Sequence, residues 1–471
     1  MKRIIVSIHL SLLSFIILGQ PLKPFGPLPS KQQMNWHNME FYLFMHFGPN
    51  TFSDLEWGHG TEDPDSFNPT QLDCRQWARI AKTAGAKGII ITAKHHDGFC
   101  LWPSKFSTHT VRESKWRNGK GDVLKELAEA CKEYGLKFGI YISPWDRNHP
   151  KYGTPEYNDV YVNTMKEAVK NYGPIFEMWW DGANGEGPNG KKQVYDFRRF
   201  EKAIRQAAPR AVVFSDIGPD IRWVGNENGI AGETNWNLLD TAGFARGAGG
   251  PSQDTLNRGN VNGQNWIPAE CDVSIRPGWF YHAKEDDKVK SGKELMSLYL
   301  KSVGRGANFL LNVPPDTRGL IHENDSAALM DFHRLRNELS KTNLVLHSKV
   351  DVSSNRSGYF PGSLTDGSRK THWAPKEGQT TCSIEIEMKS PQTFNTILVE
   401  EYIELGQRIQ SFSIEVWDGM QYQEVIAGTT IGKKRILQFA EHTSSKIRIM
   451  ITGSKATPVI GEISVYQAEV Y

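Results

Sequence analysis

The chain has 471 residues, which is too long for a lone small binding module and fits one large domain followed by a smaller one. Hydrophobic residues make up 39% and charged residues 23%, a balance typical of globular proteins that bury a core, which argues against disordered or collagen-like chains. The 55 Lys and Arg residues nearly balance the 53 Asp and Glu residues, so we expect no nucleic acid or anionic membrane as a partner.

The first twenty residues have the layout of a cleaved secretion signal. Lys2 and Arg3 precede an apolar run from Ile4 to Leu18, and Gly19 follows it. A membrane anchor is the alternative, but this run contains serines and is short for a bilayer span of roughly 20 residues. We therefore expect residues 1–19 to be removed and the mature protein, without a membrane span, to be exported to the periplasm or the medium.

Residues 20–346 alternate short apolar runs with amphipathic helical stretches, which indicates repeated strand–helix units on a parallel sheet. Six runs are predicted to be strands: 41–48, 87–98, 137–146, 174–182, 211–218 and 307–315. We place two weaker strands, the sixth and seventh, between Gly229 and His282. The length of the alternation, roughly 300 residues, favours a (β/α)₈ barrel over an open doubly wound sheet, since no dinucleotide fingerprint opens the first unit.

Two of the predicted helices have clear start and stop signals. Asp73 and Asp122 are suited to cap helix N-termini, and each precedes a one-sided apolar stripe. Gly85 and Gly135 then end the helices. Such stripes are typical of helices that cover the outside of a barrel.

Residues 347–471 follow a different pattern. Alternating runs such as CSIEIEM, SFSIEVW and SSKIRIMITG are separated by turn residues, without any helical period. This predicts an all-β module, of the sandwich type.

The five cysteines are odd in number, widely scattered and never spaced as CxxC. This pattern argues against a disulfide framework and against a zinc site. We expect most of them to be buried as small hydrophobic residues.

Polar and aromatic residues collect where the predicted strands end, which is the face of a parallel barrel that carries the active site. They are His46, Glu56, Trp57, His95, His96, Trp145, Asp146, Trp179, Trp180 and Asp181. Each one alone has a plain alternative role as a cap or a core-rim residue. Four strand ends in succession favour a site.

A metal site at His95, His96 and Asp97 is disfavoured, because adjacent strand residues point to opposite sides and no HExxH motif accompanies them. A GxSxG elbow, a Walker loop and a dinucleotide fingerprint are also absent. What remains is carboxylates among aromatic residues, the equipment of glycoside hydrolysis, in which no cofactor is needed.

Several motifs resemble those of glycoside hydrolase family 29, the retaining α-L-fucosidases. They are FYLFMHFGPNTFSDLEWGHGTEDPDSFNP, AKHHDGFCLWPSKFS, YISPWDRNHP, MWWDGANG and RWVGNENG. The resemblance covers about Met34 to Ile321. The SPWDRNHP and VGNENG versions resemble the subfamily that prefers α-1,3- and α-1,4-linked fucose in branched, Lewis-type glycans.

The resemblance implies roles for individual residues at the strand ends and in the loops that follow them. Asp181 is the nucleophile, and this agrees with a carboxylate fixed on a strand end beside Trp180. Trp279 closes over the fucose methyl group, with a core tryptophan as the alternative, while Asp272 and Arg276 serve the aglycone. The residues expected to contact the sugar are His46, Glu56, Trp57, His95, His96, Trp145 and Trp180.

The acid/base residue is predicted to be Glu227, on the loop after the fifth strand. Glu233 and Glu270 are rivals for this role, and a solvated surface carboxylate is the plain alternative for all three. Two other functions stay open: a retaining exo-glycosidase for another terminal sugar, and a glycan-binding surface protein with an inactive barrel.

The C-terminal module resembles a discoidin-type, coagulation-factor type C sandwich and carbohydrate-binding module family 32. The resemblance rests on LTDGSRKTHWAP, with a turn at Asp366 and Gly367 followed by His372 and Trp373. We expect a structural or docking role for this module more than capture of substrate.

Overall fold

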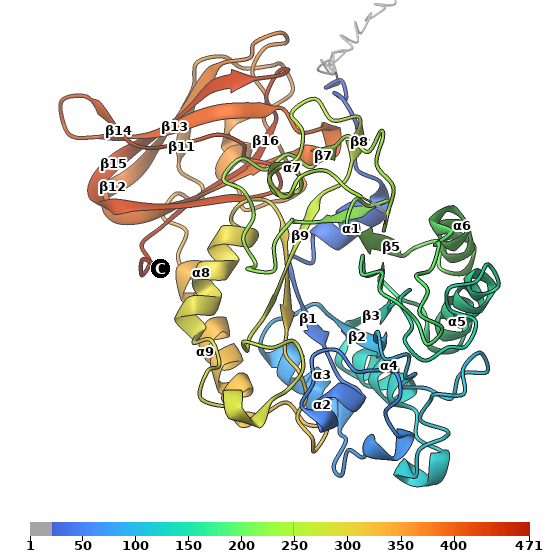
Figure 1. The fold of residues 1–471 in the computed structure, drawn as a ribbon. Coiled ribbons are helices and arrows are strands. Elements are labelled where there is room, and N and C mark those ends of the chain that lie inside the picture. The colour runs from blue at the N-terminus through green and yellow to red at the C-terminus, as the bar shows by residue number, and fades with distance from the viewer. Residues whose placement is uncertain (1–20, 248) are drawn as a thin grey trace, which may run out of the picture.

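The computed structural model describes residues 21–247 and 249–471, so the signal predicted at residues 1–19 lies outside the described residues. The chain forms a closed parallel barrel followed by a β-strand module (Figure 1). No helix in the described ranges is long and apolar enough to cross a membrane.

Parallel strands close the barrel in the order β1–β10–β9–β6–β5–β4–β3–β2, which confirms the predicted fold class. Their bounds are β1 (Phe41–Met45), β2 (Gly88–Lys94), β3 (Lys137–Ile142), β4 (Glu177–Trp179), β5 (Val212–Ser215), β6 (Ile221–Trp223), β9 (Ala269–Ser274) and β10 (Asn308–Asn312). Strands such as β1 and β2 are buried along their whole length. This is why their sequences are continuous apolar runs.

The sixth barrel strand differs from the prediction. β6 lies before Gly229, and residues 216–220 join it to β5 without a helix. It contains only Ile221, Arg222 and Trp223, too few residues to form a recognisable apolar run. The seventh strand, β9, lies in the predicted interval. Before it, β7 (Leu238–Leu239) and β8 (Asn265–Trp266) pair as antiparallel strands, with α7 (Gln253–Arg258) between them.

Helices surround the barrel, and both predicted caps are confirmed. The Asp73 side chain accepts from the backbone N–H groups of Arg75 and Gln76, and Asp122 accepts from that of Lys125. The helix bounds are α1 (Lys31–His37), α2 (Pro49–Ser53), α3 (Cys74–Thr83), α4 (Val123–Tyr134), α5 (Tyr157–Tyr172), α6 (Phe197–Ala207), α8 (Gly292–Ser302) and α9 (Glu323–Leu339). All five cysteines are buried, as expected.

The C-terminal module is the predicted all-β sandwich. Its strands are β11 (Lys349–Val352), β12 (Cys382–Glu401), β13 (Ile409–Trp417), β14 (Tyr422–Gly428), β15 (Arg435–Ser454) and β16 (Ile460–Tyr466). The long strand β12 pairs with β11 through its first part and with β16 through its last part. Trp373 is fully buried in the module's core, and its Nε1 donates to Asn355 at 2.8 Å. This contact fits a structural role for Trp373.

A buried ion pair joins the two domains. Glu40, just before β1, accepts from Lys434 Nζ at 2.7 Å, and Arg369 lies 3.3 Å away. Burial alone would raise the pKa of Glu40, but Lys434 and Arg369 outweigh it and lower that pKa to about 2. The barrel and the sandwich are therefore held together by charges that solvent screens poorly.

Replacing Lys434 with Met should destabilise the protein by about 3 kcal/mol, because it removes the closest positive charge from the largely buried Glu40 carboxylate and leaves it with the more exposed partner Arg369. The wild-type contribution of Glu40 should be complete above its ordinary pKa of 4.5 and should be lost as pH falls towards about 2. Thermal unfolding of both proteins between pH 7 and pH 3 measures the difference.

Lys446→Met is the matched control. Lys446 bridges two glutamates, Glu385 and Glu387, but its side chain is about one-third exposed, at 32%. That substitution should cost less than about 1 kcal/mol. Equal losses for the two variants would contradict a special role for the Glu40–Lys434 pair.

Candidate active site

The carboxyl ends of four neighbouring strands bring the predicted residues to one rim. β1 leads to His46, β2 to His95 and His96, β3 to Trp145 and β4 to Asp181. The ring centroids of His46 and His95 are 5.8 Å apart, and His96 Nε2 lies 3.8 Å from Asp181 Oδ2. These side chains therefore form one cluster.

Asp181 is held in one orientation and remains accessible. Its Oδ1 accepts from the backbone N–H of Ala183 at 2.7 Å, and its Oδ2 accepts from the Tyr141 hydroxyl at 2.9 Å. The side chain is 24% exposed. A carboxylate fixed in this way is preorganised to meet a ligand at the top of the barrel.

The three rim histidines are neutral near pH 7, because burial disfavours their charged forms. Burial lowers the pKa of His46 to about 3 and that of His96 to about 4, although the charge of Asp181 opposes both shifts. Burial also lowers the pKa of His95 well below its ordinary value. Asp181 is therefore surrounded by uncharged hydrogen-bonding groups.

His96 and its neighbour Asp97 form hydrogen bonds within the protein. His96 Nδ1 lies 2.7 Å from Ser143 Oγ, and Asp97 Oδ1 accepts from the Phe99 backbone N–H at 2.7 Å. No set of three or more His, Cys, Asp or Glu side chains is arranged to hold a metal ion in the part of the chain that the structure describes.

Two tryptophans form an aromatic wall beside His96. The Trp145 ring packs against the His96 ring with 4.8 Å between their centroids. The Trp57 ring meets both Trp145 and His96 edge-on at 5.7 Å. Trp145 is held by a hydrogen bond from its Nε1 to the Glu186 carbonyl at 3.0 Å. Trp57 is 57% exposed, so its ring offers an apolar surface to a ligand.

Glu56 and Trp279 meet on the other side of the rim. The backbone N–H of Trp279 donates to Glu56 Oε2 at 2.9 Å, and that of Phe280 donates to Oε1 at 3.2 Å. The Trp279 ring lies 5.1 Å from that of His46. The loop after β9 is thereby fastened over the end of β1.

Glu227 is connected to the same loop. Its Oε2 accepts from Trp279 Nε1 at 3.2 Å, and its side chain is exposed. It follows β6 and not the fifth strand, because β6 occurs earlier in the chain than the sequence pattern indicates.

The two rival glutamates lie elsewhere. Glu233 is 78% exposed and pairs with Arg305, while its backbone carbonyl accepts from Arg435 of the sandwich. Glu270 is fully buried inside the barrel, where it accepts from Trp179 Nε1 at 2.9 Å. Of the three glutamates, Glu227 is the one that is exposed and also contacts an aromatic residue of the rim.

Trp180 is a correction to the sequence prediction. It is 0% exposed, and its Nε1 contacts Met165 Sδ at 3.3 Å on the outer side of the barrel wall. Side chains alternate along a strand, so Trp179 and Asp181 share the inner side and Trp180 faces away. Trp179 is the inner residue, and it stacks on Phe214 at 4.1 Å.

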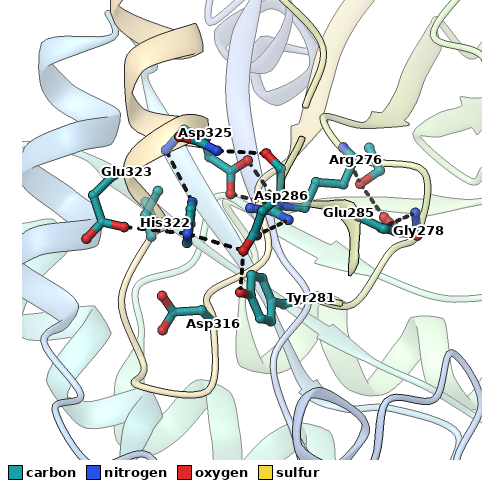
Figure 2. Close-up of polar contacts among 12 residues, drawn as sticks. Arg276, Gly278, Tyr281, Glu285, Asp286, Asp316, His322, Glu323 and Asp325 are labelled. Carbon is teal, nitrogen blue, oxygen red and sulfur yellow. Dashed lines mark hydrogen bonds and ion pairs between the residues drawn. The ribbon is translucent and has the colours of Figure 1, made fainter. Parts of the chain in front are cut away.

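Arg276 is a second correction. Figure 2 shows its guanidinium directed at the side chains of Asp286 and Asp325. Its Nε donates to Asp325 at 3.0 Å, its Nη1 donates to Asp286 at 2.9 Å, and the side chain is 0% exposed. The Tyr281 hydroxyl also donates to Asp286, at 3.2 Å. Arg276 therefore anchors the loop that carries Trp279 and does not reach a ligand.

Asp272 lies on the inner side of β9 and is buried. Burial raises its pKa well above the ordinary value, and the charges of Glu270 and Glu227 add to the effect. Burial therefore favours the neutral form of the Asp272 carboxyl group, which sits beneath the rim.

Sequence reasoning missed Tyr141, Asn312 and Asp216. Asp216 directly follows β5, so the rule that strand ends form the site could have found it. Both of its carboxylate oxygens lie within 2.5 Å of the position that a Cβ on Gly182 would take, so they are packed against Gly182. Burial together with the Asp181 charge raises the pKa of Asp216 to about 6. Tyr141 lies within a strand, and only the structure shows that its side chain points into the barrel.

Both domains match models of known protein families. Residues 28–335 match the family model described as alpha-L-fucosidase, and residues 349–463 match the F5/8 type C domain. The Arabidopsis thaliana protein named alpha-L-fucosidase 1 is 44% identical over 451 residues, covering 94% of this chain and 88% of that protein.

Solved structures are similar over nearly the whole chain. A glycoside hydrolase 29 family member from an unknown rumen bacterium is 41% identical with a TM-score of 0.85, covering 95% of this chain and 79% of that one. A Ruminococcus gnavus GH29 fucosidase in complex with fucose is 32% identical with a TM-score of 0.87, covering 96% and 97% of the two chains.

Tyr141→Phe should lower kcat/KM for nitrophenyl α-L-fucoside about 10- to 100-fold, because it removes a hydrogen bond to a charged group while keeping the ring. Steady-state kinetics at pH 7, together with the melting temperature, measure the effect.

Tyr161→Phe removes the same atom on the outer side of the barrel, where the Tyr161 hydroxyl donates to the Ile142 carbonyl at 2.7 Å. This control should lower the melting temperature and change kcat/KM less than about twofold. A loss of activity as large as that of Tyr141→Phe would show that stability alone explains both effects.

Proposed function

Because the chain belongs to the α-L-fucosidase family and is a glycoside hydrolase, we propose that it removes terminal α-linked L-fucose from glycans with retention of configuration. One observation carries the proposal: Asp181 is an accessible, oriented carboxylate among neutral imidazoles and aromatic rings. Glu227, a second carboxyl group, approaches the same cluster through Trp279.

The proposed reaction is a double displacement. Asp181 attacks C1 of fucose while Glu227 gives a proton to the glycosidic oxygen, so that the C1–O bond breaks and an ester forms. Glu227 then takes a proton from water, the water oxygen attacks C1, and the ester bond to Asp181 breaks. Each step forms one bond to C1 and breaks one, which restores the enzyme.

The rim suits a deoxysugar that has three hydroxyl groups and one methyl group. Neutral His46, His95 and His96 can hydrogen-bond hydroxyl groups without competing with Asp181 for charge. The rings of Trp57 and Trp279 supply apolar surface for the methyl group and the ring C–H groups.

We further propose a preference for α-1,3- and α-1,4-linked fucose in branched glycans. Asp272 and Arg276, the residues expected to serve the aglycone, are both buried, so the proposal needs another group to recognise the branching sugar. Asp216 is suitable: it stands between Asp181 on β4 and the loop of Glu227, and no other residue in the described ranges hydrogen-bonds its carboxylate. With Glu227 as the proposed proton donor, this position faces the side from which the leaving sugar would depart.

Two accompanying proposals rest on other features. Export follows from the sequence of residues 1–19 alone. A structural or docking role of the sandwich is supported by the buried Glu40–Lys434 contact and by the burial of Trp373.

Substitutions at the two proposed catalytic carboxyl groups should have different signatures. Asp181→Asn should lose several orders of magnitude in kcat for every fucoside, since no ester can form. Glu227→Ala should slow a fucosylated trisaccharide far more than nitrophenyl fucoside, whose leaving group needs little protonation, and azide should partly restore the rate. Fucose release on both substrates measures this.

Glu233→Ala is the matched control and should retain near wild-type rates on both substrates. A leaving-group-dependent loss in Glu233→Ala would move the acid/base role there. Wild-type protein that cleaves galactosides and not fucosides would favour another exo-glycosidase, and glycan binding without any hydrolysis would favour an inactive barrel.

The linkage preference should appear as a higher kcat/KM on Lewis-type trisaccharides than on the matched disaccharides without the branching galactose, by about tenfold or more. Asp216→Asn should narrow this ratio. Because the ratio compares two substrates on one enzyme sample, it does not depend on how much of the variant is folded. Equal values for the two substrates on the wild type would disprove the preference and leave the fucosidase assignment intact.

A further inference from the structure

Asn312 ends the last barrel strand and is fully buried beside His46. Its Oδ1 lies 3.2 Å from the His46 backbone nitrogen and 2.9 Å from His46 Nδ1. Its Nδ2 lies 2.9 Å from Ser274 Oγ and 2.7 Å from the Trp279 carbonyl oxygen. Both ends of this amide are thus occupied by rim elements.

Two of these contacts fix the orientation of the amide. A backbone N–H can only donate, so the atom that faces the His46 nitrogen must be the oxygen. A backbone carbonyl can only accept, so the atom that faces Trp279 must be the NH₂ group. Because Oδ1 has no hydrogen to give, the contact with His46 Nδ1 requires that this ring nitrogen carry the proton.

His46 holds a single ring proton near pH 7. Burial lowers its pKa to about 3, and of the groups that face it, Asp181 raises the pKa while His96 lowers it. The rings around it are Phe44 at 4.5 Å, Trp279 at 5.1 Å, Phe280 at 5.4 Å, His95 at 5.8 Å and Tyr141 at 6.2 Å. With the proton on Nδ1, Nε2 presents a lone pair and acts as a hydrogen-bond acceptor.

His95 is set the opposite way. Asn50 Nδ2 lies 3.2 Å from the Glu56 carbonyl oxygen, which can only accept, and 3.4 Å from His95 Nδ1. Asn50 therefore directs an N–H group at His95 Nδ1, which must accept. The single proton of neutral His95 is then on Nε2, and this nitrogen acts as a donor.

We propose that Asn312 is a positioning residue that fixes His46 as the Nδ1–H tautomer, so that the site offers one imidazole acceptor, His46 Nε2, beside one imidazole donor, His95 Nε2–H. The same amide holds the Trp279 carbonyl and so couples the tautomer to the loop that carries Trp279. The role of the pair in binding a sugar hydroxyl rests on the proposed function, whereas the tautomers themselves do not.

The first test measures the tautomers directly and needs no activity. Full-length protein labelled with ¹⁵N-histidine is studied by NMR at pH 7, and the His46→Gln and His95→Gln spectra assign the two rings by their missing signals. We expect a protonated Nδ1 in His46 and a protonated Nε2 in His95. Finding the His46 proton on Nε2, or averaged between both nitrogens, would overturn the proposal.

The second test changes the partner of His46. In Asn312→Asp a carboxylate faces His46 Nδ1 and raises the pKa of His46. This carboxylate also cannot donate a hydrogen bond to the Trp279 carbonyl. We expect kcat/KM for nitrophenyl fucoside to fall about 10- to 100-fold, with a new acidic limb in the pH profile. The lone pair on Nε2 exists only above the raised pKa, so activity should decline as pH falls through it.

Asn308→Asp is the matched control, since Asn308 is a fully buried asparagine at the opposite end of the same strand, where it donates to the Trp36 carbonyl. It should lower the melting temperature without adding a limb to the pH profile. The same new limb in both variants, or in neither, would overturn the positioning role. A wild type without fucosidase activity would instead contradict the proposed function, and the NMR result would still decide the tautomers.

Discussion

The pairing of β1 with β10 closes the barrel, and the active-site geometry depends on this closure. Phe44 pairs with Asn312, and the backbone N–H of Val313 donates to the Phe44 carbonyl at 2.8 Å. This register brings Asn312 to His46 across 266 positions of sequence. In an open sheet the first and last strands would be separate, so the histidine that ends β1 would lack the amide that orients it.

The closed barrel also determines the electrostatics around Asp181. The neighbouring imidazoles are buried enough to be neutral, and burial likewise favours the neutral form of Asp272 beneath the rim. An oriented carboxylate in such surroundings interacts strongly with positive charge that develops at a bound sugar, because few mobile dipoles screen it. Asp216 is the exception, a carboxyl group beside Asp181 whose pKa of about 6 leaves it responsive to pH.

Loops supply the other half of the site, and they are held from outside it. The Trp279 loop is anchored by Arg276, whose partners Asp286 and Asp325 lie on a loop and on α9. This anchoring role explains why Arg276, a charged residue near the predicted ligand-binding Trp279, is buried. The sequence places Arg276 in a polar loop, and nothing in the local pattern tells an anchor from a ligand contact, because its partner Asp325 is 49 positions away.

The sequence by itself determined the barrel, the sandwich and the cluster at the strand ends, because buried parallel strands require continuous apolar runs and the residues that end them meet at one face. Only the tertiary structure decided which side chains face inward: Trp179 and not Trp180, and Tyr141 beneath Asp181. Strand β6 was not recognised in the sequence because its three residues are too few to show a strand pattern. The roles of Asn312 and Arg276 depend on contacts between distant segments, which no local pattern encodes.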